Sequence, residues 1–529
     1  MGVISRGYAA LAGITAAAVA IGTAEPVAVL TGPRSAPLVA VGGLVVDTVP
    51  EPVKQFGIAV FGTYDKIALL VCTALLLAGF AALLGVLAAR RLWLGPAGIA
   101  VFAALGVAAA LTRAGADAAD ALPALVGAAL GALALRLLLA GPLHPDPWPW
   151  TPPAESREGI LVNTPLSTRG RSLPPEGRRR FLTGVGALTG AAVVTGLGGH
   201  WLAGRRGVSA ARQAVALPAP ASPAPAVPAG ADLSLSQLAP YVSPTFGFYR
   251  IDTALVVPQV DPDTWRLRVH GRVRNPIELS FADLLARPMV ERYVTLACVS
   301  NEVGGDLIGN ARWLGVPIRE LLDEARPEEG ADQVVGRSVD GWTCGTPTAV
   351  LRDGRDALLA VGMNGEPLPV EHGFPVRMVV PGLYGYVSAC KWVTELELTS
   401  FADFDAYWVP RGWSAQGPIK TQSRIDTPRP RNRLTAGPVT VAGVAWAQHR
   451  GIRRVEVRVD DGPWREATLA PVVSVDTWVQ WSWQWTATTG EHTLQVRATD
   501  ADGETQTERR QRVDPDGATG WHTVRVTVR

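Results

Sequence analysis

The stretch Tyr293-Val-Thr-Leu-Ala-Cys298-Val-Ser-Asn301 places a single thiol at the end of an apolar, β-like run. The glycine-containing loop Gly304-Gly305-Asp306 follows it. Further along the chain, His372-Gly-Phe-Pro-Val-Arg377 and Lys391-Trp392 add a histidine and two cations. A thiolate is a soft ligand that suits a redox metal, and Arg and Lys recognise phosphate. The pattern therefore predicts a metal held by Cys298 beside an anionic organic cofactor.

Three blocks carry a family resemblance, in this order: Cys298-x-x-Asn301, Asn310-Ala-Arg312-Trp-x-Gly315 and His372–Arg377. Together they closely resemble the sulfite oxidase family of molybdopterin enzymes, and the resemblance extends over about residues 240–529. A lone cysteine is more often a small buried hydrophobe, so the metal-ligand prediction rests on this resemblance. It implies a molybdenum–molybdopterin cofactor (Moco), with Cys298 as the metal ligand and a catalytic residue.

The resemblance also implies roles for other residues. Arg250 aligns with the substrate-anion arginine, although Ile251 and Asp252 stand where the family has Asn and His. Arg411 lies in a loop that matches the family's substrate side, and a solvated loop arginine is the alternative. Outside this context His372 is more often a satisfied turn histidine, and Arg377 a surface ion pair. The implied cofactor-binding residues are Tyr249, Arg250, Asn301, Arg312, Asp340, His372, Arg377, Ser388 and Lys391.

One departure from the family concerns the substrate. The sulfite oxidases carry a catalytic Tyr in a segment that aligns with Gly341–Pro347, and Cys344 occupies its place. Tyr384 or Tyr407 could supply the missing phenol from another loop, and we take Tyr384 as a catalytic candidate. A thiol is a weaker hydrogen-bond donor than a phenol. We therefore expect poor turnover of sulfite, and we expect Cys344→Tyr to raise it.

Composition bounds the class of protein. At 529 residues, two to four domains are expected. The net charge of +2 gives no case for nucleic acid. The four cysteines form no CxxC pair and no zinc spacing, so the sequence does not indicate a disulfide scaffold. A Cys344–Cys390 bridge stays open.

The N-terminal region has apolar runs long enough to cross a bilayer. A shorter apolar segment, Pro37–Val49, is expected to be re-entrant or interfacial. The spans contain no paired histidines for haem, so we expect no haem and interpret the region as an anchor or a partner-docking surface. The cysteine spacing likewise gives no expectation of zinc. The five predicted transmembrane helices are Tyr8–Leu30, Ile67–Ala89, Ala97–Thr112, Ala121–Ala140 and Phe181–Ala203.

Arginines beside the spans predict the orientation, because positive residues stay in the cytoplasm. Arg6, Arg90 and Arg91, with the cluster before the fifth span, place the N-terminus inside and the residues after Ala203 outside. Arg178-Arg179-Arg180-Phe-Leu182 resembles a twin-arginine export signal, and an ordinary positive-inside anchor explains the same arginines. The prediction is a multi-pass protein of the cell membrane with an extracytoplasmic catalytic domain.

Alternating short strands from about residue 415 onward predict an immunoglobulin-like β-sandwich. The cofactor region mixes strands such as Trp265–His270 with a helix capped by Ser280, which predicts an α+β domain. The predicted domains are a multi-pass transmembrane region (1–150), a cytoplasmic linker with the fifth transmembrane helix and the twin-arginine-like motif (151–215), a Pro/Ala-rich linker (216–235), the α+β sulfite-oxidase-like molybdopterin domain (236–412) and the immunoglobulin-like dimerisation domain (413–529).

Two classes of function follow. The first is an oxidoreductase that transfers an oxygen atom to or from a small oxyanion in two-electron steps, with Cys298 and the anion-binding Arg250 and Arg411. Sulfite-type oxidation leads, and reduction of an S- or N-oxide such as methionine sulfoxide is the alternative. The second class is a non-catalytic, membrane-anchored binding protein. The expected partners are the bilayer, an unidentified electron-transfer partner and, through the C-terminal domain, a second copy of the chain.

Overall fold

The computed structural model describes residues 4–49, 53, 60–61, 65–113, 116–145, 175–205 and 207–529. The chain forms two compact units. Unit 1 contains residues 1–207 with 254–256, and unit 2 contains residues 208–253 and 257–529. Residues 151–174 of the predicted cytoplasmic linker, including Arg157, Arg169 and Arg171 of the arginine cluster, lie outside the described residues.

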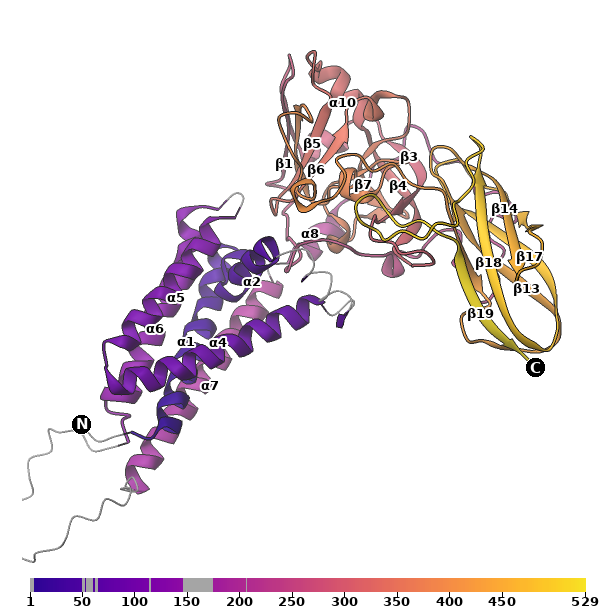
Figure 1. The fold of residues 1–529 in the computed structure, drawn as a ribbon. Helices are drawn as coiled ribbons and strands as arrows, with labels where there is room; N and C mark the ends of the chain where they lie inside the picture. Colours follow the sequence, from indigo (N-terminus) through magenta and orange to yellow (C-terminus); the bar gives the residue numbers. More distant parts are fainter. Residues whose placement is uncertain are drawn as a thin grey trace, which may run out of the picture. The chain divides into compact units, whose positions relative to one another are not determined.

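Unit 1 is helical (Figure 1). Among the described residues, five helical segments are long and apolar enough to cross a membrane: Arg6–Thr31, Ile67–Arg90, Leu94–Leu111, Ala118–Ala140 and Glu176–Leu202. Each of them overlaps one predicted span. The short apolar segment at Pro37 is helical as well. The helices are α1 (Arg6–Thr31), α2 (Pro37–Thr48), α4 (Asp65–Arg90), α5 (Leu94–Leu111), α6 (Leu122–Ala140) and α7 (Pro175–Arg205).

Helix α1 packs against α4, α6 and α7 at backbone distance. A Cβ atom added at Gly13 would lie 1.9 Å from the carbonyl oxygen of Ala81 in α4, and one at Gly22 would lie 2.3 Å from that of Ala192 in α7. On α6, a Cβ at Gly127 would lie 2.4 Å from the carbonyl oxygen of Ala20. Small residues at such contacts let helices approach closely, which is how helices associate in lipid.

Unit 2 begins with an α+β domain. Its first sheet has the strand order β2-β1-β10-β5-β6, and its second has β3-β4-β7-β8, with β9 paired to β7. The elements are α8 (Ser209–Ala214), β1 (Arg266–Gly271), β2 (Ile277–Ser280), α9 (Phe281–Leu285), β3 (Val290–Ala297), β4 (Ile308–Pro317), α10 (Ile318–Ala325), β5 (Gln333–Ser338), β6 (Thr343–Pro347), β7 (Leu358–Met363), β8 (Glu366–Pro367), β9 (Arg377–Val379) and β10 (Val393–Thr399).

Local sequence signals explain two of these elements. The alternating run at Trp265–His270 forms β1, whose Leu267 and Val269 are fully buried between exposed neighbours. Ser280 caps α9 as predicted, because its hydroxyl accepts a hydrogen bond from the Asp283 amide at 3.1 Å. The Asp283 carboxylate in turn accepts the Ser280 amide, which completes a capping box.

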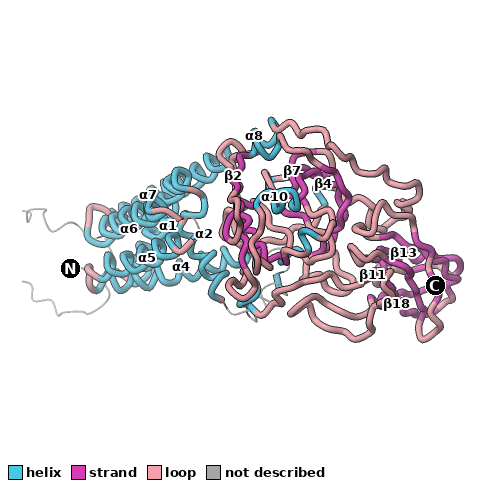
Figure 2. The backbone as a smooth tube through the Cα atoms, turned by 90° about the horizontal axis from the view of Figure 1, so that it is seen from above, coloured by secondary structure: helices cyan, strands magenta, loops and turns pink. Residues whose placement is uncertain are grey.

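The C-terminal part of unit 2 is a sandwich of two sheets, visible as the strand-rich region around β11, β13 and β18 in Figure 2. The sheet orders are β11-β13-β17-β16 and β12-β19-β18-β14-β15. The predicted strands are confirmed, and Trp481 is fully buried in the core of the sandwich. The strands are β11 (Gln422–Thr427), β12 (Arg433–Leu434), β13 (Gly437–Trp446), β14 (Ile452–Val459), β15 (Arg465–Glu466), β16 (Thr468–Leu469), β17 (Val479–Ala487), β18 (Gly490–Asp500) and β19 (His522–Val528).

The predicted Pro/Ala-rich linker, residues 216–235, needs a correction. It is extended, as such a composition favours, but it does not separate two parts of the chain. The Ala221 amide donates to the Met289 carbonyl at 2.7 Å, and the Glu291 amide donates to the Ser222 carbonyl at 2.9 Å. Ser222 thereby forms a parallel bridge with Val290 of β3. The segment is part of the catalytic fold.

Candidate active site

Strand β3 ends at Ala297. The next residue, Cys298, is the first residue of a loop whose two ends are joined by a hydrogen bond. The Cys298 amide donates to the Leu307 carbonyl at 2.9 Å, and the Asn301 amide donates to the Cys298 carbonyl at 3.1 Å. The side-chain oxygen of Asn301 accepts the Leu307 amide at 2.9 Å. Residues 298–307, here called the Cys298 loop, therefore fold back on themselves. The Cys298 thiol is buried and unbridged, and burial raises its pKa.

Two cations, Arg250 and Lys391, contact one carboxylate, Asp252, and a third cation, Arg377, acts electrostatically on Lys391; we call these four residues the cation cluster. Lys391 Nζ donates to Asp252 Oδ2 at 2.7 Å, and Arg250 Nε donates to the same oxygen at 2.9 Å. Arg377 is buried, donates to the His372 carbonyl at 3.2 Å and lies over the ring of Trp313. Three cations against one carboxylate leave a local excess of positive charge.

Burial, and for Lys391 and His372 also the neighbouring cations, sets the pKa values in this region. Burial, with Arg377 and Arg250 nearby, lowers the pKa of Lys391 to about 8, although Asp252 opposes the shift. Burial lowers the pKa of Arg377 to about 10. Burial and the charges of Arg377 and Lys391 lower the pKa of His372 to about 3, so this imidazole is neutral at neutral pH. A bound anion would relieve the repulsion among these cations.

Tyr249 lies within electrostatic range of both the Cys298 thiol and Arg377. Burial raises the pKa of its phenol, and the charges of Cys298 and Arg377 both act on it, so it stays protonated at neutral pH. The Tyr249 ring stacks on Phe248 at 5.1 Å, and the Phe248 edge meets His372 at 5.7 Å and Trp313 at 5.8 Å. The structure thus brings Cys298, Tyr249, Arg250, His372, Arg377 and Lys391 into one region, and their roles at the site stay predictions.

Three predicted cofactor residues have other contacts. Arg312 pairs with Glu291 at 3.2 Å, and on the β3–β4 ladder it lies opposite Tyr293. That register puts it toward the far end of β3 from Cys298. Asp340 closes the β5–β6 turn by accepting the Trp342 amide at 3.1 Å. The buried hydroxyl of Ser388 donates to the Tyr384 carbonyl at 2.9 Å. Their roles as cofactor ligands stay predictions.

The two remaining catalytic candidates lie on loops. The Arg411 guanidinium stacks 3.7 Å from the centroid of the Tyr407 ring and donates to the Tyr407 carbonyl at 2.5 Å. Tyr384 is buried, and it lies beside Ala297, Asn301, Glu302, Gln422 and Trp446. Burial raises the pKa of Tyr384 to about 12. Tyr384 therefore lies beside the Cys298 loop as a neutral hydrogen-bonding group.

The predicted role of Cys344 in place of a catalytic Tyr is not supported. Cys344 is fully buried in the domain core, with its Sγ 4.0 Å from Met378 Sδ and a hydrogen-bonding contact to Cys390. The Gly336 backbone closes the remaining side, because a Cβ added there would lie 3.1 Å from Cys344 Sγ. Cys344 and Cys390 are both free thiols in this structure. A phenol would overpack this site, so Cys344→Tyr is expected to destabilise the domain rather than raise turnover.

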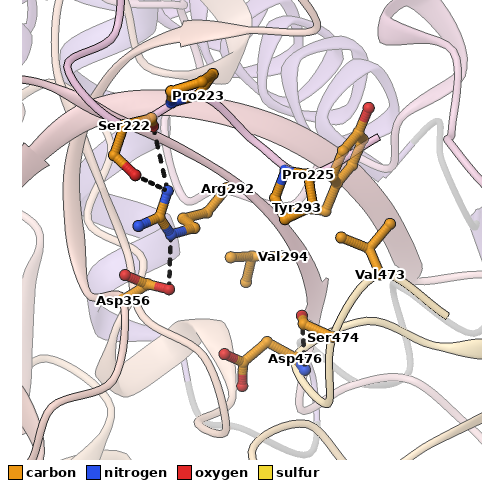
Figure 3. Close-up of a pocket in the computed structure, with 10 residues that line it drawn as sticks. All are labelled: Ser222, Pro223, Pro225, Arg292, Tyr293, Val294, Asp356, Val473, Ser474 and Asp476. Atoms are coloured by element: carbon orange, nitrogen blue, oxygen red, sulfur yellow. Dashed lines mark hydrogen bonds and ion pairs between the residues drawn. The ribbon is translucent and has the colours of Figure 1, made fainter. Parts of the chain in front are cut away.

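A cavity of about 280 Å³ lies elsewhere in unit 2 (Figure 3). Arg292 is already engaged there, by Asp356 at 2.9 Å and by the Ser222 hydroxyl at 3.2 Å. None of the predicted site residues lines this cavity. Its walls are Ser222, Pro223, Pro225, Arg292, Tyr293, Val294, Asp356, Val473, Ser474 and Asp476.

Three residues of the cluster region were not assigned a role from sequence. Asp252 was noted as a departure from the family pattern, yet it is the counter-charge of Arg250 and Lys391. Phe248 and Trp313 form the aromatic wall behind His372 and Arg377. The ion pair of Asp252 with Arg250 could have been predicted from sequence, because an acidic side chain two residues after an arginine can reach its guanidinium.

His372 gives a pH-dependent prediction. Below pH 6.5 the unfolded chain protonates this histidine, whereas the folded chain does not until about pH 3. Protons therefore favour unfolding, and the free energy of unfolding should fall by up to about 1.4 kcal/mol per pH unit in this window. His372→Gln should flatten that slope, measured by unfolding of the cofactor-free full chain in detergent.

The control is His492→Gln. Asp460 raises the pKa of His492, so its contribution to stability has the opposite sign: it is present at low pH and is lost as pH rises. This variant should keep the acid slope. An unchanged slope in His372→Gln would show that the imidazole is not held neutral.

Comparison with known proteins places the described site in context. Residues 254–408 match the family model of the oxidoreductase molybdopterin binding domain, and residues 422–496 match that of a bacterial Ig domain. The mitochondrial sulfite oxidase of Rattus norvegicus is 33% identical over 272 residues, which cover 43% of this chain and 49% of that protein. The chain thus spans about half the length of this curated relative.

Two further similarities complete the comparison. An uncharacterized oxidoreductase of Bacillus subtilis (strain 168), YuiH, is 34% identical over 183 residues, which cover 34% of this chain and 88% of that protein. Among solved structures, the sulfane dehydrogenase SoxCD from Paracoccus pantotrophus aligns at a TM-score of 0.48 with 25% identity, covering 54% of this chain and 81% of that chain.

Proposed function

This chain belongs to the family of oxidoreductases with a molybdopterin-binding domain, and from this premise we propose that it is a membrane-anchored enzyme that transfers an oxygen atom in two-electron steps, as sulfite oxidases do. One observation carries the proposal: a buried thiol, Cys298, shares a region with Tyr249 and a buried excess of positive charge. The membrane anchor is supported by the five apolar helices of unit 1.

The described residues fit a molybdenum–molybdopterin cofactor. Cys298 offers one sulfur ligand of the kind that soft redox metals prefer. Arg377 and Lys391 are buried cations, and burial is the first cause of their lowered pKa values, so an anion bound beside them would favour their charged forms. A phosphate group supplies that charge, and charge-assisted hydrogen bonds from Arg and Lys to phosphate are strong. We therefore assign Cys298 to the metal and Arg377 and Lys391 to the phosphate of the pterin.

The other site residues would act on the substrate. Molybdenum on molybdopterin, when bound, supplies the two-electron oxygen-atom chemistry. Arg250 has a 38% exposed side chain, so its guanidinium can attract a small oxyanion from solvent. Tyr249 keeps its proton because burial raises its pKa, so its phenol can donate a hydrogen bond to an oxygen atom. Positioned donors that act on developing charge accelerate such reactions, typically by about 10²–10³ each.

The test is direct. The full chain is purified with its cofactor, its molybdenum content is measured, and it is assayed for sulfite oxidation with a dye acceptor and for methionine sulfoxide reduction with a reduced dye. Molybdenum with sulfite turnover supports the proposal. Sulfoxide reduction without sulfite oxidation would assign the reverse direction. Protein that binds no molybdenum and turns over neither substrate would indicate the non-catalytic class.

Topology gives a second prediction. Arg178–Arg180 lie in the first turns of α7, before its apolar stretch, and positive residues at a span favour the cytoplasmic side. We expect a reporter that is active only outside the cytoplasm to be active when fused after Arg529. Replacing Arg178, Arg179 and Arg180 by Lys keeps the charge but removes a twin-arginine signal. Loss of the outside signal in this variant supports twin-arginine export, and a retained signal assigns the arginines to topology alone.

A further inference from the structure

We infer that the C-terminal sandwich positions Cys298, and that Arg424 of β11 and His522 of β19 are the residues that do so. They meet the Cys298 loop at its Gly304-Gly305 turn. Arg424 Nη1 donates to the Gly305 carbonyl at 2.6 Å. The imidazole edge of His522 packs against the Gly304 backbone. The inference rests on the proposed function in one respect, since it takes Cys298 as the metal ligand.

Arg424 is held rigidly for this contact. Its Nε donates to Asp426 Oδ1 at 2.5 Å and its Nη2 donates to Asp426 Oδ2 at 3.3 Å, so the carboxylate accepts two hydrogen bonds from the guanidinium. Asp426 Oδ2 also accepts the Ala239 amide at 3.0 Å. The two side chains are 10% and 8% exposed. A buried two-point pair of this kind fixes geometry, so the third donor of Arg424 points at Gly305 from a fixed position.

The backbone of Gly304 and Gly305 is too closely packed to accept a side chain. A Cβ added at Gly304 would lie 2.2 Å from His522 Cδ2, and the φ of Gly304 is +83°. A Cβ added at Gly305 would lie 2.6 Å from Asn301 Oδ1. The His522 ring is itself fixed, because its Nδ1 accepts the Ile425 amide at 2.9 Å. Burial and Arg424 lower the pKa of His522 to about 4, so it remains a neutral acceptor at neutral pH.

The turn is connected to the thiol through few bonds. Gly305 packs on the side-chain oxygen of Asn301, which accepts the Leu307 amide, and the Leu307 carbonyl accepts the Cys298 amide. A shift of the turn therefore reaches the residue that carries the sulfur. Outer partners of a metal ligand typically change metal affinity or activity by about 10–100-fold. Arg424 and His522 would thus be positioning residues supplied by a different domain.

The first test removes both charges of the buried pair at once. Arg424→Gln with Asp426→Asn avoids leaving one buried charge alone, and Asn can still accept the Ala239 amide. In the cofactor-free full chain, we measure alkylation of Cys298 and amide exchange of residues 298–307, each resolved by peptide mass spectrometry. Both rates should rise about tenfold or more, the effect of losing one charged hydrogen bond. Arg454→Gln is the control, since the Arg454 side chain, 3.6 Å from Glu456 on the same sandwich, is 44% exposed.

The second test separates positioning from general stability. Gly304→Ala introduces the collision with His522 and a strained φ, so it should also accelerate Cys298 alkylation. Adding His522→Ala should recover part of that change, because the collision is then relieved. The inference would be overturned if Arg424→Gln with Asp426→Asn gave the same alkylation and exchange rates as Arg454→Gln. It would also be overturned if His522→Ala recovered none of the change caused by Gly304→Ala. Since the assays use cofactor-free protein, a chain that binds no molybdenum would refute the proposed function and leave these rates unaffected.

Discussion

Cys298→Ser is expected to abolish molybdenum-dependent turnover while the chain stays folded. Serine is nearly isosteric with cysteine, so the buried site keeps its packing. It replaces a soft sulfur ligand by a hard oxygen that does not suit the metal. Even outer partners of metal ligands cost about 10–100-fold when removed, so loss of the ligand itself should cost at least about 10²-fold. Turnover and molybdenum per polypeptide are the two measurements.

Cys72→Ser is the matched control, because Cys72 is an exposed free thiol on α4, in the other unit. It should keep both molybdenum and turnover. A Cys298→Ser protein with the activity of the unmodified chain would remove the thiol from the site. The rest of the site would then need another metal ligand.

Lys391→Met should be the second most damaging change. The buried ammonium contacts Asp252 and the Glu371 carbonyl, and we assign it to the cofactor phosphate. A hydrogen bond to a charged group contributes about 1.5–3 kcal/mol, which corresponds to a loss of about 10–150-fold in cofactor affinity. Molybdenum and pterin retained after gel filtration measure this loss.

The pH dependence of reloading adds a second readout. In the cofactor-free chain the pKa of Lys391 is about 8, so the ammonium is charged below that pH and neutral above it. Reloading should therefore weaken as pH rises through about 8, and Lys391→Met should lose this dependence. Arg268→Gln is the control, because Arg268 is 55% exposed and 3.8 Å from Glu395. Full retention of cofactor by Lys391→Met would exclude the lysine from phosphate binding.

Much of the cation cluster could be predicted from sequence because its parts lie in short motifs. His372, Arg377 and Lys391 lie within twenty residues of one another, and the Met378 amide donates to the Cys390 carbonyl beside them at 2.8 Å. The apolar spans and alternating strands were also predictable, since each repeats a local period that the fold preserves. Local patterns of this kind depend little on distant contacts.

The errors share a different cause. Cys344 lies on β6, where four successive residues from Thr343 are buried on both faces, so no alternation showed which way the thiol points. The segment 216–235 has a composition typical of a spacer, and the same extended conformation also suits pairing with β3. The contacts of Arg424 and His522 with the Cys298 loop join residues more than a hundred positions apart. Sequence patterning carries no signal for such pairings.

The close packing of α1 has a consequence for assembly. Its Gly22 faces the carbonyl of Ala192 on α7, a helix synthesised more than a hundred residues later. Until α7 arrives, the small-residue face of α1 has no helix to fill it on that side. If α7 inserts into the membrane only after the catalytic domain has folded around its cofactor in the cytoplasm, the helix bundle is completed only in protein that carries the cofactor. Protein that never acquires cofactor would then be left with an open bundle, a state that membrane proteases can recognise.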